Sequence, residues 1–132
     1  MPVIEKSPDQ AIHDALFAIS LQLGYSTYNY LPGKESTYPF VFIGEVFEQS
    51  RSTKSHLFGD YQVTIHIYAD DPQRDRKTVS TMQNNIKNAF YQLKHTNGYQ
   101  IIPKRHNGQI MLDNSTGVTF IHGILELDMT IN

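Results

Sequence analysis

Cysteine is absent from the 132-residue chain, and this absence removes several classes of function together. Without a thiol there is no disulfide framework, no thiolate ligand for zinc and no cysteine nucleophile. Stability must therefore come from packing or from association with other chains. Tryptophan is absent too, but seven phenylalanines and eight tyrosines are present. Tyrosine joins an apolar ring to a polar tip, which suits half-buried strands and contact surfaces.

The chain also lacks an excess of positive charge and any long apolar run. The chain has eleven Lys and Arg side chains and thirteen Asp and Glu side chains, which gives a net charge of −2. This charge provides no excess positive field to attract a phosphate backbone. The sequence contains no apolar stretch of about 18 residues and no signal-peptide pattern. We therefore expect an unexported protein in solution, with no membrane contact and no tight binding of nucleic acid. The length predicts one domain over residues 1–132.

Two segments have the periodicity of amphipathic helices. Ser7, Pro8 and Gln10 together predict a helix start with a capping box, and Gly24 stands where a left-handed residue ends the helix. Asn97-Gly98 is interpreted as the end of the second helix. Five apolar side chains at helical spacing predict the inner face of this second helix: Val79, Met82, Ile86, Phe90 and Leu93.

Alternating or β-branched stretches predict the strands. The expected strands are a short one early in Tyr25–Tyr38, then Phe40–Phe47, Tyr61–Ala69, Tyr99–Ile102, Gln109–Leu112 and Val118–Ile131. The segment Lys104–Gly108 is interpreted as a hairpin, and Gly44 and Gly123 as bulges. The pattern predicts an α+β fold: a mixed, mainly antiparallel sheet with the two amphipathic helices packed on one face.

The titratable residues do not assemble a recognisable reaction centre. His66 and His122 lie in predicted strands and are candidates for neighbours, but no third metal ligand follows from the spacing. Glu126 and Asp128 share the outer face of the last strand, where solvation or protection of a sheet edge explains them. Neither a Gly-rich phosphate loop nor a GxSxG motif is present. We predict no catalytic residue, no metal, no cofactor and no enzymatic activity.

A polar segment from Glu48 to Asp60 has no helical or strand period until Leu57, and it is longer than most hairpin loops. Basic side chains stand beside two large apolar ones, a mixture that suits contact with a partner protein; a hairpin tip without function is the alternative. The candidate interaction residues are Glu48, Arg51, Lys54, His56, Leu57 and Phe58. The exposed tyrosines expected at Tyr25, Tyr28 and Tyr30 also suit an interface, or cover the sheet.

One segment carries a resemblance to a known family. Its sequence is Tyr38-Pro39-Phe40-Val41-Phe42-Ile43-Gly44-Glu45, and it is followed by Gly59-Asp60-Tyr61 and an alternating strand that contains a histidine. With the two amphipathic helices and the polar loop in the same order, nearly the whole chain resembles the tail terminator proteins of tailed phages, also called tail completion or tail-to-head joining proteins, of siphophages and prophages.

The resemblance implies a structural virion protein that is assembled in the bacterial host cytoplasm and lies at the head–tail interface. It implies a hexameric ring that caps the tail tube, stops its polymerisation by occlusion and docks on the head completion or connector protein. DNA would pass through the lumen without specific binding. Glu48–Phe58 resembles the strand-connecting loop of the family, which orders on assembly.

Three alternatives remain open from the sequence. A neighbouring head-completion or tail-tube subunit has a similar pattern. A small ligand- or metal-binding domain would use His66 and His122 within a cleft. A host regulatory module is the third, although the chain has no basic recognition helix.

Overall fold

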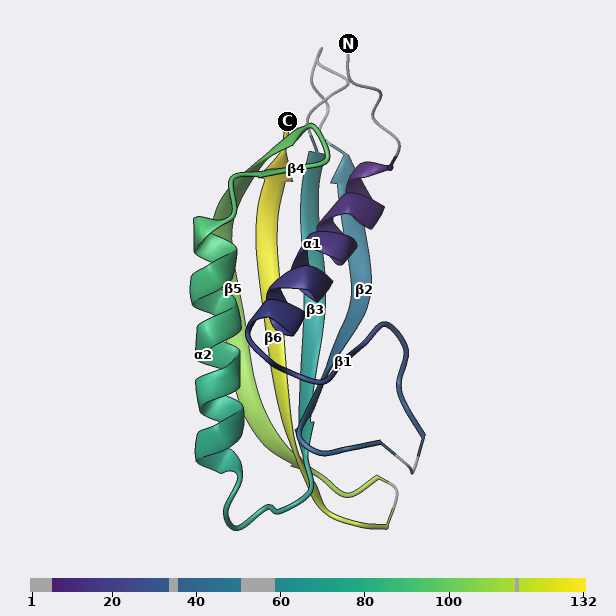
Figure 1. Ribbon diagram of the computed structural model, residues 1–132, viewed down its shortest axis with the longest axis vertical. Coiled ribbons are helices and arrows are strands. Elements are labelled where there is room, and N and C mark those ends of the chain that lie inside the picture. Colours follow the sequence, from purple (N-terminus) through teal and green to yellow (C-terminus); the bar gives the residue numbers. More distant parts are fainter. Residues whose placement is uncertain (1–5, 34–35, 51–58, 116) are drawn as a thin grey trace.

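The computed structural model describes residues 6–33, 36–50, 59–115 and 117–132. Within them the elements follow in the order α1 (Pro8–Gln22), β1 (Thr27–Tyr28), β2 (Phe40–Ser50), β3 (Gly59–Ala69), α2 (Arg76–Gln92), β4 (His95–Thr96), β5 (Tyr99–Asp113) and β6 (Phe120–Ile131). Figure 1 shows these elements along the long axis of the molecule.

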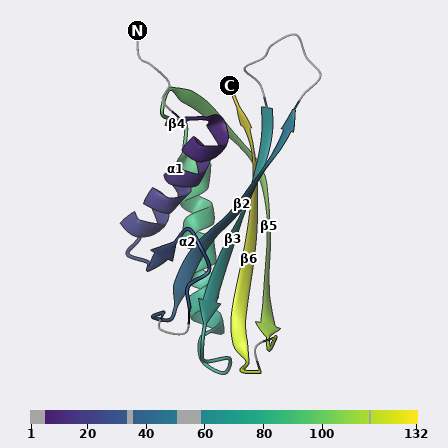
Figure 2. The same cartoon turned by 90° about the vertical axis from the view of Figure 1, so that its right-hand side faces the viewer.

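The six strands form one sheet in the order β1-β2-β3-β6-β5-β4. β1 runs parallel to β2, and every other neighbouring pair is antiparallel. Both helices lie on the same side of this sheet, as Figure 2 shows. The predicted α+β class, with a mixed, mainly antiparallel sheet, is therefore confirmed.

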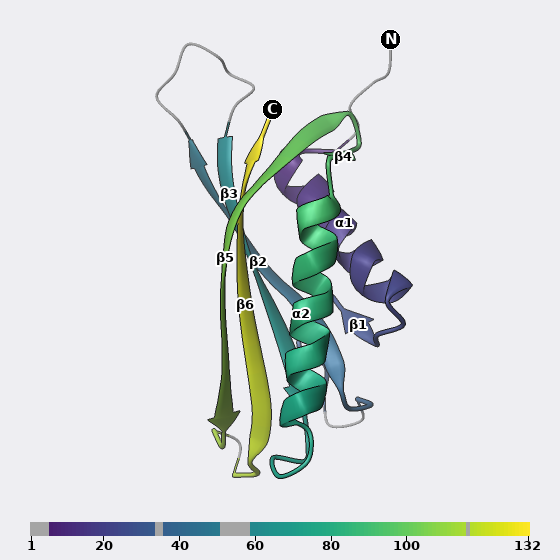
Figure 3. The same cartoon turned by 90° about the vertical axis from the view of Figure 1, so that its left-hand side faces the viewer.

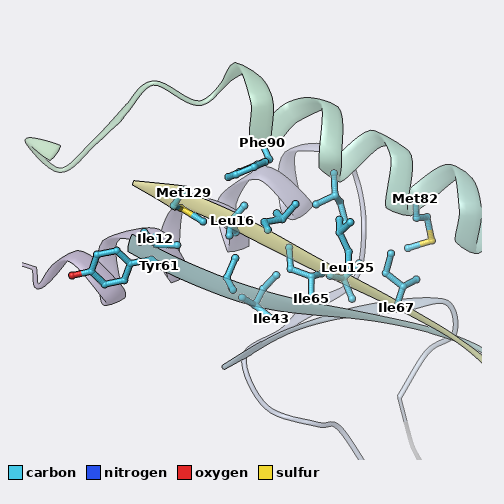
Figure 4. Packing of buried hydrophobic residues seen from close by; sticks show 14 of the residues in the cluster. Ile12, Leu16, Ile43, Tyr61, Ile65, Ile67, Met82, Phe90, Leu125 and Met129 are labelled. Carbon is cyan, nitrogen blue, oxygen red and sulfur yellow. The ribbon is translucent and has the colours of Figure 1, made fainter. Parts of the chain in front are cut away.

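The core lies between the sheet and the helix layer. α1 packs on β2, and α2 packs on β5 and β6, along the length of the sheet in Figure 3. The period-2 alternation of β3 places every second side chain in the core, including Val63, Ile65 and Ile67, none of which is exposed. From the helices, Ile12, Leu16, Met82 and Phe90 close the other side of this core (Figure 4).

The start of α1 only partly follows the prediction. Ser7 is the N-cap residue and Pro8 lies in the first turn, but the Ser7 hydroxyl makes no capping hydrogen bond. The Gln10 amide donates instead to Asp14 Oδ1 at 2.8 Å. The predicted capping box is therefore wrong, because the Gln10 side chain extends toward Asp14 one turn later and does not reach back to the backbone N–H of Ser7. Gly24 has the predicted left-handed conformation, with φ of +89°.

The chain contains two Asn-Gly pairs, and both were misassigned. α2 ends at Gln92, before the first pair, and Asn97 and Gly98 have φ of 49° and 84° in the turn between β4 and β5. His95 pairs with Gln100 across this turn, so it is a two-residue hairpin. The second pair, Asn107-Gly108, lies within β5, a continuous strand of 15 residues. The hairpin predicted at 104–108 is therefore wrong, and a register shift between Pro103 and Arg105 stands in its place.

The two predicted glycine bulges have different outcomes. The register of β2 against β3 shifts between Ile43 and Val46, so the bulge at Gly44 is confirmed. At Gly123 the register of β6 is regular against both neighbours. A Cβ at Gly123 would lie 2.7 Å from Val79 Cγ1 and 2.8 Å from Gln83 Oε1. Gly123 therefore allows α2 to approach the sheet closely, which is a packing role and not a bulge.

The predicted polar loop is shorter than expected because both flanking strands extend into it. β2 continues to Ser50, and β3 begins at Gly59, its cross-strand partner. Residues 51–58 lie outside the described part of the chain. None of the helices in the described residues is long and apolar enough to cross a membrane.

Candidate interaction surface

The sheet has one face packed under the helices and one face that no described element covers (Figure 2). The strand alternation determines which side chains lie on this open face. Along β3 the half-buried positions alternate with the core positions, and the cross-strand register extends the same face onto the neighbouring strands. Aromatic side chains occupy one end of the open face, and charged side chains the other.

The aromatic end contains a continuous set of rings in contact, most of them stacked, which we call the aromatic cluster: Tyr38, Phe40, Phe42, His66, Tyr68, Phe120 and His122. The Tyr68 and His122 rings are 4.1 Å apart between centroids and nearly parallel, at 13°. Phe42 stacks on His66 at 5.3 Å, and Tyr38 on Phe120 at the same distance. Gly44 makes room for this packing, since a Cβ there would lie 3.2 Å from the His66 ring.

His66 and His122 form a hydrogen-bonded pair within the aromatic cluster, so the expectation that they are neighbours is confirmed. His66 Nδ1 lies 2.8 Å from His122 Nε2. Burial lowers the pKa of His66. It also lowers the pKa of His122 to about 4, with a further contribution from His66 and an opposing one from Asp113. Both imidazoles are therefore neutral at pH 7, and one ring nitrogen donates to the other.

This pair does not continue into a metal centre. In the described ranges, no group of three or more His, Asp or Glu side chains is placed to hold a metal ion. The Asp113 carboxylate is 3.7 Å from His122 Nδ1, but its other oxygen accepts hydrogen bonds from the Ser115 backbone N–H and hydroxyl. The hydrogen bond between the two rings orients them against each other.

The charged end of the open face is a network across three strands. Asp128 on β6 accepts a hydrogen bond from Arg105 Nε at 2.7 Å and another from Gln62 Nε2 at 2.9 Å. Lys104 Nζ lies 3.8 Å from Asp60 Oδ1, which also accepts from the Thr130 hydroxyl. β6 is a central strand, so protection of a sheet edge was the wrong interpretation of Asp128. Its carboxylate neutralises Arg105 beside it.

The structure describes one of the six predicted interaction residues. Glu48 lies on β2, exposed, and its Oε2 accepts a hydrogen bond from the Tyr61 hydroxyl at 3.0 Å. The other five, Arg51, Lys54, His56, Leu57 and Phe58, lie outside the described residues. The interaction role of the set stays a prediction.

The three tyrosines of the early segment have different environments. Tyr25 packs against the core, and its hydroxyl accepts a hydrogen bond from the Asn85 amide at 3.0 Å. Tyr28 packs edge-on against Phe40. Tyr30 is 63% exposed. Only Tyr30 is therefore exposed as expected.

Sequence reasoning missed an apolar groove beside the aromatic cluster, which we call the end groove. It has a volume of about 560 Å³ and lies where the segment between β1 and β2 meets the connection between β5 and β6. Leu31 and Val118 are both 59% exposed there. The side chains that define it are Leu31, Pro32, Tyr68, Asp113, Val118 and Phe120. Its members come from three separate stretches of the chain, so no local sequence signal reveals it.

Comparisons with known proteins identify the fold. No family model matches the chain, and no curated protein matches it. Among solved structures, the bacteriophage SPP1 gp17 protein is similar with a TM-score of 0.62 and 22% identity, over 97% of this chain and 94% of that one. A chain of the virion of a native gene transfer agent particle is similar with a TM-score of 0.56 and 10% identity, over 98% of each chain. The chain thus has, over nearly its whole length, a fold found in a bacteriophage protein and in a gene transfer agent virion.

Proposed function

We propose that this chain is a structural subunit of a tailed-phage particle that forms a ring, of six copies by the family resemblance, at the head-proximal end of the tail. The ring stops tail-tube polymerisation by covering the surface on which the next tube ring would stack. It also joins the tail to the head completion or connector protein. The subunit acts through its surfaces and carries no catalytic role.

The observation that carries this proposal is the likeness in fold, over nearly the full length, to the SPP1 gp17 protein and to a gene transfer agent virion chain. The open sheet face supports it, because a six-stranded sheet with helices on one side leaves the other side available for contact. Among the described residues of that face, Lys104 and Arg105 each lie beside an aspartate, and such paired charges suit a subunit past which DNA moves without being held.

The ligand- or metal-binding alternative has less support. His66 and His122 bond to each other instead of converging on an open site, and the described residues supply no third ligand. Metal analysis of the purified protein tests this choice directly. Stoichiometric zinc or another transition metal that resists dialysis would favour the alternative.

The proposal is tested by adding the purified protein to tails that lack their own terminator. We expect tails of uniform length that attach to filled heads, as seen by electron microscopy. An unrelated protein of similar size and charge serves as the control. Overlong or headless tails in both samples would contradict the terminator role. Tail attachment without length control would instead indicate a head-completion subunit. Native mass spectrometry of the capped tail ends measures the number of copies.

A further inference from the structure

The end groove is an apolar site with one fixed negative charge. Asp113 is the only charged side chain among the described residues that line it. Its Oδ1 accepts hydrogen bonds from the Ser115 backbone N–H at 3.0 Å and the Ser115 hydroxyl at 2.7 Å. These bonds hold the carboxylate in place and lower its pKa. The complement of this groove is therefore a segment with large apolar side chains and positive charge.

The chain itself contains such a segment between β2 and β3. Residues 51–58 read Arg-Ser-Thr-Lys-Ser-His-Leu-Phe. Arg51 and Lys54 are positive, no residue of the segment is acidic, and Leu57 and Phe58 are adjacent large apolar side chains. A leucine and a phenylalanine suit a pocket lined by Leu31, Val118 and Phe120.

The segment cannot reach the end groove of its own chain. It leaves the sheet at Ser50 and returns at Gly59, whereas the groove residue Tyr68 pairs with Phe40 at the opposite end of these strands. Gly59 and Tyr68 are nine positions apart along β3, which corresponds to roughly 30 Å. A loop of eight residues whose two ends are held by neighbouring strands extends at most about 16 Å from those ends. Figure 1 shows this separation, with the end of β2 near the C-terminus and the β5–β6 connection at the lower end.

From this complementarity and this distance, we propose that the end groove binds residues 51–58 of a second copy of the chain. Such a contact joins two different surfaces, so copies associate head to tail, and a head-to-tail contact closes into a ring when the rotation between copies allows it. The inference rests on the ring assembly proposed above and identifies the two surfaces that would make it.

Disulfide trapping tests the contact without background, because the chain has no cysteine. One chain carries Leu57→Cys, and a second chain with a size tag carries Val118→Cys. We expect a mixed disulfide-linked dimer after mild oxidation. The matched control pairs Leu57→Cys with Leu21→Cys, since Leu21 is also apolar and 52% exposed but lies on α1 and does not line the groove. Circular dichroism before oxidation verifies that each variant is folded.

Equal yields with the Leu21→Cys control would overturn the inference. So would a linked monomer from the double variant Leu57→Cys/Val118→Cys, which is expected to form linked oligomers only. Capture of a different particle protein by Leu57→Cys, with no link to Val118→Cys, would assign the segment to that protein.

A labelled peptide of residues 49–60 provides a second measurement of the same contact. Fluorescence anisotropy should show binding to the folded protein, and Asp113→Asn should weaken it by roughly two- to fivefold, the range for one partly exposed ion pair. Val118→Ser should weaken it further. If the peptide does not bind the folded protein, the inference is wrong, even if the wild-type protein terminates tails normally. If neither trapping nor tail termination is observed, the proposed function fails as well.

Discussion

His66 and His122 lie diagonally across β3 and β6, and their Nδ1 and Nε2 atoms are 2.8 Å apart. Tyr68 is the direct cross-strand partner of His122, so the two imidazoles and this phenol stack on one face. A protonated pair would place two positive charges at hydrogen-bond distance inside a half-buried set of aromatic rings. The folded state therefore disfavours protonation of either histidine.

This pair predicts a specific pH dependence of stability. Both folded-state pKa values are lowered, that of His122 to about 4, so below about pH 6.5 the unfolded chain binds more protons than the folded one. The free energy of unfolding should fall by roughly 1 kcal/mol between pH 7 and pH 5 after allowance for partial exposure. Urea unfolding at the two pH values measures it.

The double variant His66→Gln/His122→Gln should remove most of this pH dependence. The matched control is His95→Gln, because His95 is exposed on the short strand β4. If the pH dependence of the free energy of unfolding persisted in the double variant and disappeared in His95→Gln, it would have to come from a group other than the His66–His122 pair.

Gly123→Ala should destabilise the protein by about 2 kcal/mol, because the new methyl group must displace Val79 or Gln83 and so lift α2 from the sheet. Chemical denaturation measures the loss. Gly33→Ala is the control, since no atom of the described residues lies within 4 Å of a Cβ at Gly33, and it should leave the stability within about 0.5 kcal/mol of the wild type. Equal stabilities of the two variants would contradict the close approach of α2.

Tyr61→Phe should lower the free energy of unfolding by about 1 kcal/mol, because it removes the hydrogen bond from the Tyr61 hydroxyl to Glu48. Burial, followed by this bond to Glu48, raises the pKa of Tyr61. A double-mutant cycle with Glu48→Gln isolates the pair. A coupling energy of zero would mean that Glu48 does not hold its place on β2 in solution.

Gly98→Ala should cost about 1–2 kcal/mol, because alanine is strained at the φ of 84° in the β4–β5 turn. Thermal unfolding measures the loss. Gly108→Ala is the informative comparison, since the other Asn-Gly pair has no left-handed residue. Any loss of stability in Gly108→Ala comes from contact between the new methyl group and the Gln83 amide. The second substitution Gln83→Ala should therefore restore the lost stability. If Gln83→Ala also restored the stability lost in the Gly98→Ala variant, the assignment of Gly98 to the turn would be contradicted.

The elements that periodicity predicts well are those whose burial alternates regularly along the chain. β3 and α2 present one apolar face each, so their existence and inner faces follow from the sequence. The two Asn-Gly pairs show where local reasoning fails. The dipeptide has the same local preference at both places, and the strand pairing around it decides whether it turns.

The candidate surface could be predicted only in part. The proximity of His66 and His122 follows from two strands that share a face. The end groove does not follow, because it depends on how the segment before β2 and the connection after β5 meet in space. The network of Asp128 with Gln62 and Arg105 likewise required the strand order, which places β6 between β3 and β5.

The central position of β6 has a consequence for biosynthesis. β6 follows all other strands in the chain and joins β3 to β5, so the two halves of the sheet share no strand until β6 is inserted. A nascent chain that stops before Phe120 holds the β2–β3 hairpin and β5 with no common partner. Such long-range pairing is slow to form. The open face of the sheet, with its aromatic cluster and its charged network, therefore cannot form until β6 has been synthesised, because both sets of side chains include residues of this strand.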